Sequence, residues 1–417
     1  GDEERDNSPA RIYALVPVKK TWTNEHGATA SDGWYATIVG NDIVPDIAVA
    51  RINAWKPEHV LDYAQKAFNY RNNLQTNRLW NSHVTITSGG KITDHNDLFA
   101  QQSETIRRRN IPQDYRAKRV YTSTQTVSNE YFGGTFDLKD AINSGTQYLH
   151  FIGHGGGRIW ADYNLFNFND VATLNNQTYP IVVSLACYAS SFDTNGIASI
   201  GEALVMQPNK GAIATLGFSG LGYMYQDLDW GLALTEAIYK HDFNTFGEAY
   251  QYTLTRFYAT TTLSAARYAL TNAAALLGDP LIRIIKPIGN IPVQADKYIT
   301  MPGDTLFVTA QFPGDVTAAR LYIINRNEVE VNIPYDLPVI NGNYNASYVI
   351  PTNVNPPYSR EIHVVGYSPT REYVGKSGFG VGRAALMHHS TLPANPAWND
   401  SVRFVAKVFS NEDIISL

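Results

Sequence analysis

The sequence contains one cysteine, Cys187, among 417 residues. A single thiol excludes an intramolecular disulfide and any metal cluster built on several cysteines. Charged residues are also scarce, at 17% against the ~25% usual for soluble domains, so we expect neither long solvated helices nor charged disordered tails. Cys187 is therefore either a buried thiol or a reactive one.

Long runs of one kind are missing as well. No basic tract exceeds Arg107–Arg109, and 33 basic and 38 acidic residues leave a net charge of −5, which makes nucleic acid and anionic membranes poor partners. No apolar stretch approaches the ~18 residues of a membrane-spanning helix. The opening Gly1–Asp6 does not resemble a signal peptide, so the protein is either cytosolic or has lost a leader.

The first two thirds of the chain alternate apolar, β-rich runs with segments of helical period, which is typical of a parallel sheet covered by helices. At ~150 residues per domain the length predicts two to three domains. Several runs are apolar almost throughout, as strands buried on both faces should be. The predicted core strands are Arg11–Pro17, His83–Thr87, Lys118–Thr122, Tyr148–Ile152, Ile181–Ala186 and Gly211–Leu216.

Helical spacing predicts three helices between and after these strands. The first has an apolar face of Val60, Leu61, Ala64, Ala67 and Phe68, and the second one of Leu228, Leu232, Ala237 and Ile238. The third helix is predicted over Ser264–Leu277. The third helix is expected to end at Gly278, with Pro280 just beyond. Two short β runs, Trp34–Val39 and Asp46–Ala50, flank a glycine turn and predict a hairpin.

The composition changes after Lys286. Helical periodicity ends, and short alternating runs are separated by Pro-Gly, Asn-Gly and Pro-Pro turns, which predicts a β-sandwich over 288–382. The tail, 383–417, contains the apolar run Val402–Phe409 and is interpreted as the start of a further β domain. We therefore expect the chain to be part of a longer multidomain protein.

The strongest chemical signal is a strand that runs into His154 and the glycines Gly155–Gly157, followed by a strand that runs into Cys187. Adjacent parallel strands would place the imidazole and the thiol together at the carboxyl edge of the sheet, where open α/β sheets bind ligands. A histidine can draw the proton from the thiol and later protonate a leaving amine. Bare glycines let backbone N–H groups approach an oxyanion.

Other interpretations of the polar residues stay open. Cys187 could instead be a buried core cysteine beside a turn histidine. Gly217–Gly220 offers Ser219 as an esterase nucleophile after the His154 glycine loop, but Leu221 stands where that elbow requires glycine. Asp162, Asn164, Asn169 and Asp170 form a candidate calcium loop, although such residues more often form turns. His388-His389 is expected to be exposed and inert.

In order along the chain, several segments resemble the gingipain family of caspase-like cysteine peptidases, family C25. The likeness spans about Arg11–Gly382 and implies an α/β fold, a caspase-like mostly parallel sheet flanked by helices over residues 1–286, followed by an Ig-like β-sandwich. The matching segments are Ser31–Tyr35, Ile38–Asp42, Arg51, Gly153-His154-Gly155, Trp160, Ser184–Cys187, Gly201–Leu204, Gly211–Ala214 and Leu277–Pro280.

The resemblance also implies roles for individual residues. Cys187 would be the nucleophile and His154 the general base and acid, with the N–H groups of Gly155 and Cys187 as the oxyanion hole. The family's Glu-Gly-Gly, whose Glu supports the histidine, corresponds to Ser88-Gly89-Gly90, which leaves a Cys–His dyad.

The same resemblance implies a substrate pocket. Its acidic floor would be Asp97, with Asp94 as second choice. Its walls would be Ile152 and Leu185. The family's aromatic pocket residue corresponds roughly to Tyr223–Tyr225, so Tyr223 and Met224 are the substrate-binding candidates there.

The expected function is that of a secreted cysteine endopeptidase that cleaves protein or peptide substrates, with preference for basic residues, outside the cell or at the bacterial cell surface. The chemistry requires no cofactor, and structural calcium at Asp162 and Asp170 remains open. Two alternative functions are compatible with the same residues. A sortase-like transpeptidase would transfer a protein C-terminus to an amine, and a non-catalytic cell-surface adhesin or scaffold would carry a decayed site.

Overall fold

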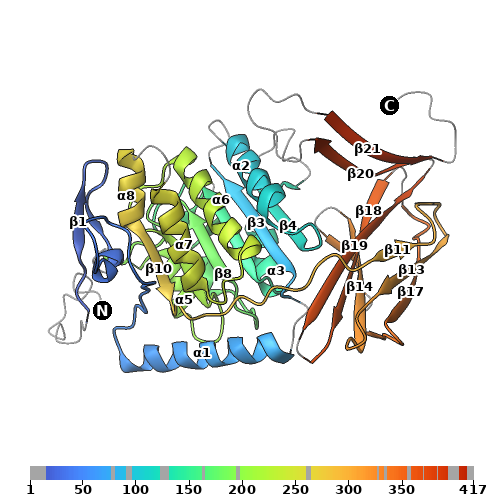
Figure 1. Cartoon of the computed structure of the whole chain (residues 1–417), viewed down its shortest axis with the longest axis horizontal. Coiled ribbons are helices and arrows are strands. Elements are labelled where there is room, and N and C mark those ends of the chain that lie inside the picture. The colour runs from blue at the N-terminus through green and yellow to red at the C-terminus, as the bar shows by residue number, and fades with distance from the viewer. Residues whose placement is uncertain are drawn as a thin grey trace. The chain divides into compact units, whose positions relative to one another are not determined.

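The computed structural model places the described residues in two compact units, the first within residues 1–111 and 117–285 and the second within 112–116 and 286–417 (Figure 1). The residues that it describes are 16–76, 80–90, 96–122, 131–161, 165–193, 198–259, 264–325, 328–332, 336–354, 358–369, 371–382, 384–392 and 403–410. Within these ranges, no helix is both long and apolar enough to cross a membrane.

A six-stranded sheet, in the order β10-β9-β8-β5-β3-β4, is the centre of the first unit. The pairs β3–β5, β5–β8 and β8–β9 are parallel, whereas β10 runs antiparallel to β9 at the edge. Five predicted core strands are confirmed, with their ends shifted by up to three residues, and Arg11–Pro17 lies mostly outside the described residues. The strands are β3 (His83–Gly89), β4 (Arg116–Tyr121), β5 (Tyr148–Gly153), β8 (Ile181–Leu185), β9 (Ala214–Phe218) and β10 (Ala274–Gly278).

Helices cover both faces of this sheet (Figure 1). One face carries α2 (Asn96–Asn110), α6 (Met224–Lys240), α7 (Phe246–Tyr258) and α8 (Ala265–Ala273), and the other carries α3 (Thr135–Asn143), α4 (Phe168–Ala172) and α5 (Ile200–Met206). Capping boxes fix the starts of three of them, through Asn167 with Asp170, Ser199 with Glu202, and Thr245 with Glu248.

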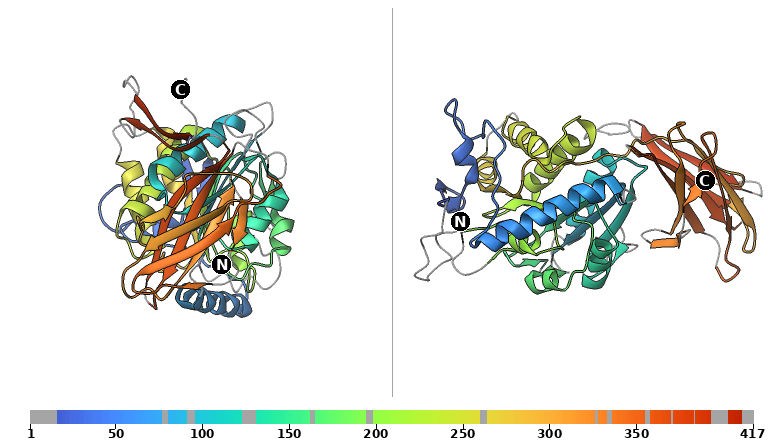
Figure 2. Two further views of the ribbon diagram at one scale, coloured as in Figure 1. Left: turned by 90° about the vertical axis from the view of Figure 1, so that its right-hand side faces the viewer. Right: turned by 90° about the horizontal axis from the view of Figure 1, so that it is seen from below.

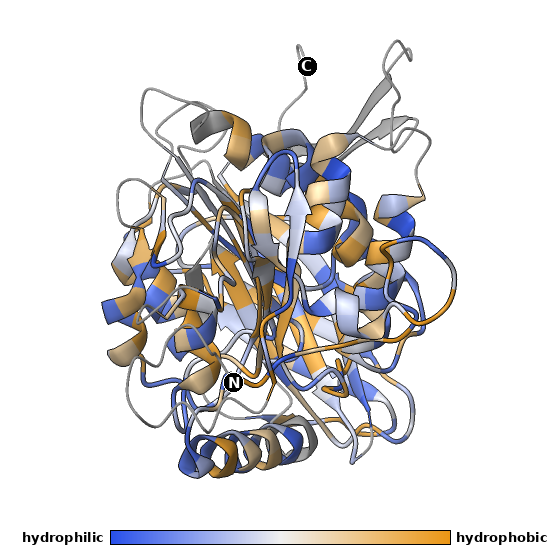
Figure 3. Cartoon of the chain, turned by 90° about the vertical axis from the view of Figure 1, so that its left-hand side faces the viewer, coloured by the Kyte–Doolittle hydropathy of each residue, from blue (hydrophilic) through white to orange (hydrophobic). Residues whose placement is uncertain are grey.

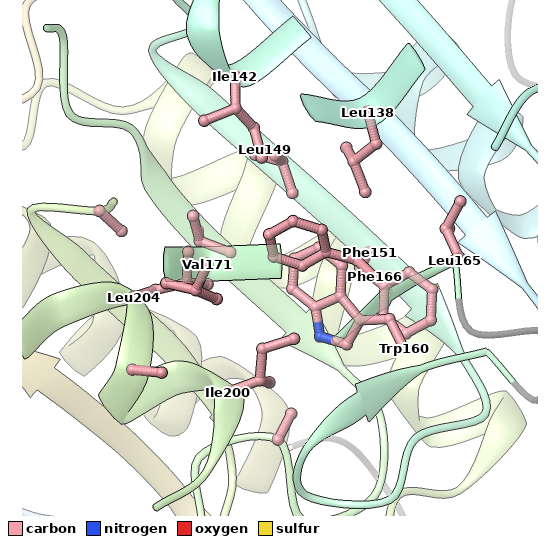
Figure 4. Packing of buried hydrophobic residues seen from close by; sticks show 14 of the residues in the cluster. Leu138, Ile142, Leu149, Phe151, Trp160, Leu165, Phe166, Val171, Ile200 and Leu204 are labelled. Atoms are coloured by element: carbon pink, nitrogen blue, oxygen red, sulfur yellow. The ribbon is translucent and has the colours of Figure 1, made fainter. Parts of the chain in front are cut away.

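The core under α3, α4 and α5 is closely packed (Figure 4). Trp160, in the short strand β6 (Ile159–Trp160) that pairs with β7 (Phe166–Asn167), stacks on Phe151 with ring centroids 4.8 Å apart. Apolar residues concentrate on the strands and on the helix faces that meet them (Figure 3). This packing holds the strand β5, which leads to His154, in a fixed position.

The helix α1 (Pro57–Thr76) lies across one end of the sheet (Figures 1 and 2). Its predicted buried face was largely wrong, since Ala67 alone of the five residues packs against the core. Val60, Leu61 and Phe68 are exposed, and the buried face carries Tyr63, Lys66 and Tyr70 instead. These side chains end in polar groups because they meet backbone carbonyls: Tyr63 donates to Ile213 (3.0 Å), Tyr70 to Arg283 (2.7 Å) and Lys66 to carbonyls at the end of α5.

The expected helix over Ser264–Leu277 was also wrong in its last four residues. The helix α8 ends at Ala273, and Ala274–Gly278 is the strand β10, in register with β9 from Ala274 opposite Phe218. All five residues of β10 are buried. The sequence pattern did not separate the two structures, because a short Ala-Leu run fits a fully buried strand as well as a helix. Gly278 therefore ends a strand, at φ 119°, rather than capping a helix.

The hairpin expected at Trp34–Val39 and Asp46–Ala50 does not form. The first run contains a 3₁₀ helix, η2 (Asp32–Ala36), and the Asp46 carboxylate accepts the N–H groups of Ile38 (2.6 Å) and Val39 (2.8 Å), which a partner strand would otherwise bond. A hairpin is found earlier instead, between β1 (Lys20–Thr23) and β2 (Gly27–Ala30).

A buried ion pair anchors this N-terminal segment to the sheet. Arg51 donates to both carboxylate oxygens of Asp32, at 2.6 and 2.7 Å, and its guanidinium lies over the ring of Phe192. The Arg51 backbone bridges to Leu277 at the end of β10. Two of the segments that resemble the gingipain family are thus joined by one bidentate contact.

The second unit consists of strands. Its two main sheets are β11-β13-β17 and β12-β19-β18-β14-β15, with β16 paired to β14, and side chains from both sheets share one core. The predicted immunoglobulin type and the domain limits remain predictions. The strands are β11 (Val293–Ala295), β12 (Ile299–Thr300), β13 (Thr305–Gln311), β14 (Ala318–Asn325), β15 (Glu328–Asn332), β16 (Leu337–Pro338), β17 (Asn343–Val349), β18 (Tyr358–Tyr367) and β19 (Glu372–Val381).

The tail contains one further strand pair, β20 (Ala384–Leu392) antiparallel to β21 (Arg403–Ser410). The predicted apolar run Val402–Phe409 lies largely in β21, and His388-His389 lies in β20. The interpretation of the tail as the start of a further β domain remains a prediction.

We predict that Lys66→Met destabilises the protein by about 2 kcal/mol, because buried carbonyls at the end of α5 lose their donor. Lys66 Nζ donates to Val205, to Gln207 at 3.0 Å and to Lys210 at 3.3 Å. Urea unfolding would measure the change, with exposed Gln65→Met on the same helix as the control. Equal unfolding midpoints for the two variants would contradict the assigned role.

Candidate active site

The pairing of β5 with β8 brings His154 and Cys187 together. The strands are parallel with Ile152 opposite Leu185, and His154 and Cys187 each follow two residues later in the chain. Neighbouring strands are ~4.8 Å apart. The segment after His154 also lies against Cys187, since the Gly157 N–H donates to its carbonyl at 3.4 Å.

Backbone contacts and bare glycines hold His154. Its N–H donates to Gly89 (3.0 Å), and its carbonyl accepts from Ala161 (2.8 Å). The imidazole meets Phe99 edge to face, with centroids 5.2 Å apart, and a methyl group at Gly90 would lie 3.2 Å from its Cδ2. Ser88 is buried, and its hydroxyl has no hydrogen-bond partner among the described residues.

The thiol of Cys187 is half-buried against the loop that precedes α6. The Gly222 N–H donates to its sulfur at 3.3 Å. Burial raises the pKa of the thiol, the Gly222 N–H lowers it, and the nearby Asp227 carboxylate raises it. The net effect is a raised pKa, so the thiol is protonated at neutral pH, and His154 follows the neighbouring strand.

The chain turns sharply immediately after Cys187. Tyr188 has a φ of 57°, in the left-handed region, which costs a residue other than glycine about 1–2 kcal/mol. Its N–H donates to the Gly220 carbonyl at 2.7 Å, so the loop before α6 supports the turn. The strained residue places a bend directly after Cys187, two residues beyond the end of β8.

The glycine loop fits closely over the Cys187 backbone. A methyl group at Gly155 would lie 3.1 Å from the Cys187 carbonyl oxygen, 3.5 Å from its nitrogen and only 2.8 Å from Ala186. A side chain at Gly155 would therefore force the two segments apart. The assignment of the Gly155 and Cys187 N–H groups to an oxyanion hole remains a prediction.

Asp227 is a site residue that the sequence analysis did not single out. It is buried in the first turn of α6 and accepts the Tyr223 N–H at 3.0 Å, while a methyl group at Gly222 would lie 2.7 Å from its Oδ2. Burial raises the pKa of its carboxyl to about 7. An aspartate just inside a helix usually suggests only a favourable helix start, so its position in the sequence carries little functional signal.

The structure places the predicted pocket residues at different depths. Ile152 and Leu185 are fully buried, and Leu185 lies under α6, where a methyl group at Gly231 would be 2.7 Å from its Cδ1. Tyr223 and Met224 start α6 partly buried, and burial raises the pKa of Tyr223 to about 12. Asp97 is the second residue of α2, while Asp94 lies outside the described residues.

The candidate calcium loop is only partly described, because Asp162 and Asn164 fall outside the described residues. Asp170 accepts the Asn167 N–H at 2.9 Å as part of the α4 capping box. No cluster of three or more histidine, cysteine or acidic side chains suited to a metal ion occurs in the part of the chain that the structure describes. Calcium binding remains a prediction.

The side chain of Ser219, the alternative nucleophile, forms a structural hydrogen bond. It is buried, and its hydroxyl donates to the Ala30 carbonyl at 2.6 Å. A hydroxyl in this position is turned toward β2 rather than toward the glycine loop after His154. This contact favours Cys187 as the nucleophile.

Residues 1–285 match the family model for peptidase family C25. The chain belongs to this family. Lys-gingipain W83 from Porphyromonas gingivalis is 22% identical over 229 residues, which are 54% of this chain and 13% of that protein. Lys-gingipain from P. gingivalis strain ATCC 33277 is 23% identical over the same lengths and shares. The chain thus matches only a small part of these C25 relatives.

Solved structures share the fold. The crystal structure of the Arg-specific cysteine proteinase gingipain R gives a TM-score of 0.53 at 18% identity, covering 88% of this chain and 81% of that chain. A second solved structure, of a protease, gives a TM-score of 0.55 at 17% identity and covers 87% of this chain and 80% of that chain. The predicted membership of the gingipain family and the sheet flanked by helices are confirmed.

We predict that Asp227→Asn speeds alkylation of Cys187 at pH 8 by about threefold, because a negative neighbour disfavours the thiolate. The amide oxygen still accepts from Tyr223. Below about pH 6 the wild-type carboxyl is protonated, so the two rate profiles should converge. Iodoacetamide rates against pH measure the effect.

The control for this prediction is Asp229→Asn, which removes a more exposed charge from the same helix. It should leave the alkylation profile unchanged. If Asp227→Asn and Asp229→Asn behave alike, the buried carboxylate does not influence the thiol.

Proposed function

We propose that the protein is a cysteine endopeptidase in which Cys187 and His154 form a catalytic dyad. The single observation that carries the proposal is the register of β5 and β8, which brings both residues to the same edge of the sheet. Membership of peptidase family C25 supports it.

The dyad would work by acyl transfer. His154 takes the proton from Cys187, and the thiolate sulfur attacks the peptide carbonyl carbon. N–H groups of Gly155 and Cys187 stabilise the oxyanion. His154 then protonates the leaving amine, and a thioester forms on Cys187. Water, deprotonated by His154, attacks the thioester carbonyl and releases the acid and the thiol.

We assign no catalytic role to the position of the family's glutamate, since Ser88 occupies it with a buried hydroxyl. The Gly89 carbonyl, the Gly90 surface and the Phe99 ring would orient His154 instead. These backbone and ring contacts help to set the orientation of the His154 imidazole.

We expect Cys187→Ala and His154→Ala each to reduce kcat/KM for a peptide substrate by ~10³-fold or more, because each removes one half of the proton-transfer pair. Hydrolysis of a fluorogenic peptide mixture measures the loss. Neither change should alter the thermal midpoint by more than a few degrees. Cleavage by Cys187→Ala at the wild-type rate would contradict the mechanism.

We also propose specificity for a basic P1 residue. The similar proteins are named Lys-gingipain and Arg-specific proteinase. A lysine or arginine side chain entering a partly desolvated pocket needs an acidic partner, since an unpaired buried charge costs several kcal/mol. Asp97 remains the candidate from the sequence, and the buried Asp227 beside the sulfur is a second source of negative charge.

A P1 substrate library with Asp97→Asn and Asp227→Asn tests this specificity. We expect Lys or Arg to exceed uncharged P1 residues by at least ~10-fold, as one lost ion pair is worth more than 1.4 kcal/mol. The variant that loses this preference while keeping cleavage after uncharged residues identifies the partner. Preference of the wild type for uncharged residues would contradict the proposal.

We place the protein outside the cell or at the bacterial cell surface. The strand-rich second unit, appended to the peptidase-family unit, favours export. Antibody detection in the medium, cell-surface and cytoplasmic fractions would test the location.

A further inference from the structure

The hairpin β1–β2 reaches the loop that contacts the catalytic thiol. It packs against α8, and the Ala30 carbonyl accepts from Ser219 at 2.6 Å at the end of β9. The turn of the hairpin carries His26, whose N–H donates to Thr23 Oγ1 at 3.0 Å. His26 is thus held by its own turn in contact with residues that follow β9.

The His26 ring packs closely against the residues that follow β9. It stacks on Tyr223 with an interplanar angle of 4° and centroids 5.5 Å apart, and a methyl group at Gly220 would lie 2.6 Å from its Nδ1. Both ring nitrogens are inaccessible to water and form no hydrogen bond with the described residues. Because burying unpaired polar atoms is unfavourable, a gain elsewhere must offset this cost.

The loop that the ring covers makes three contacts around the site. Gly220 accepts from Tyr188 at 2.7 Å, Gly222 donates to the Cys187 sulfur at 3.3 Å, and Tyr223 donates to Asp227 at 3.0 Å. The residues that His26 touches, Gly220 and Tyr223, stand on either side of the peptide that bonds the sulfur. Displacing the ring would free the loop from its outer contact.

We propose that His26 is a positioning residue, which clamps the Gly220–Tyr223 loop onto Cys187 while its imidazole is neutral and releases the loop when the imidazole is protonated. The clamp rests on the proposed function only in that the clamped thiol is taken to be catalytic. It gives the β1–β2 hairpin a role in controlling the site.

The charges around His26 set the direction of this switch. Burial lowers the pKa of His26, and the adjacent Glu25 raises it by a smaller effect. Tyr223 faces the ring, and Asp227 and Cys187 lie behind the loop. A neutral ring stacks at neutral pH. Protonation would place a charge in a partly desolvated position, and the attraction of Glu25 only partly offsets that cost, so acid favours the open loop.

Three variants test the clamp. His26→Ala removes the stack, His26→Phe keeps a flat ring that cannot be protonated, and Trp22→Ala is the control on the same hairpin, where Trp22 is 72% exposed. Iodoacetamide alkylation of Cys187 from pH 5 to 9, kcat/KM for a peptide and the thermal midpoint are measured for each full-length variant.

We expect His26→Ala to slow alkylation at pH 7.5 by about threefold and to shift its profile to higher pH, because the thiolate loses the Gly222 N–H. His26→Phe should match the wild type at pH 7.5 and exceed it increasingly as the pH falls. Trp22→Ala should match the wild type throughout. A purely structural role would change only the thermal midpoint.

An unchanged alkylation profile in His26→Ala would overturn the clamp, as would an equal shift in Trp22→Ala. The alkylation readout does not depend on peptide cleavage. If wild-type protein cleaves no peptide but the profiles shift as expected, the proposed function fails and the clamp stands.

Discussion

The parallel pairing of β5 with β8 is the constraint on which the site depends. A parallel ladder fixes the register of two strands over their whole length, so the residues that follow Ile152 and Leu185 meet at one edge. A shift of β8 by one residue would exchange the faces of all its side chains. The core of α3, α4 and α5 under Phe151, and α6 over Leu185, holds this register from both faces.

Much of the sheet could be predicted because buried strands have a strong sequence signature. The runs at His83 and Ile181 are short and rich in β-branched residues, and the run at Tyr148 is mostly apolar. Glycines follow the runs at His83 and Tyr148. His154 and Cys187 were recognisable for the same reason, since their positions follow from where the strands end. The dyad itself remains a proposal, but its location at the sheet edge did not require a structure.

The errors arose where tertiary contacts overrode local pattern. The buried face of α1 holds Lys66 because the end of α5 offers carbonyls, which no periodicity in α1 reveals. The run Ala274–Gly278 becomes a strand because the edge of the sheet accepts it. Asp227 was missed because its importance comes from burial beside Cys187, whereas its sequence context is that of an ordinary helix start.

The raised pKa of the Cys187 thiol has a consequence for survival of the protein in an oxidising environment. Peroxides attack thiolates rather than thiols, and a cysteine kept neutral by burial is oxidised slowly. No second cysteine exists in these 417 residues to reduce a sulfenic acid by forming a disulfide. A thiol that burial keeps protonated thereby avoids damage for which the 417 residues supply no second thiol as a repair partner.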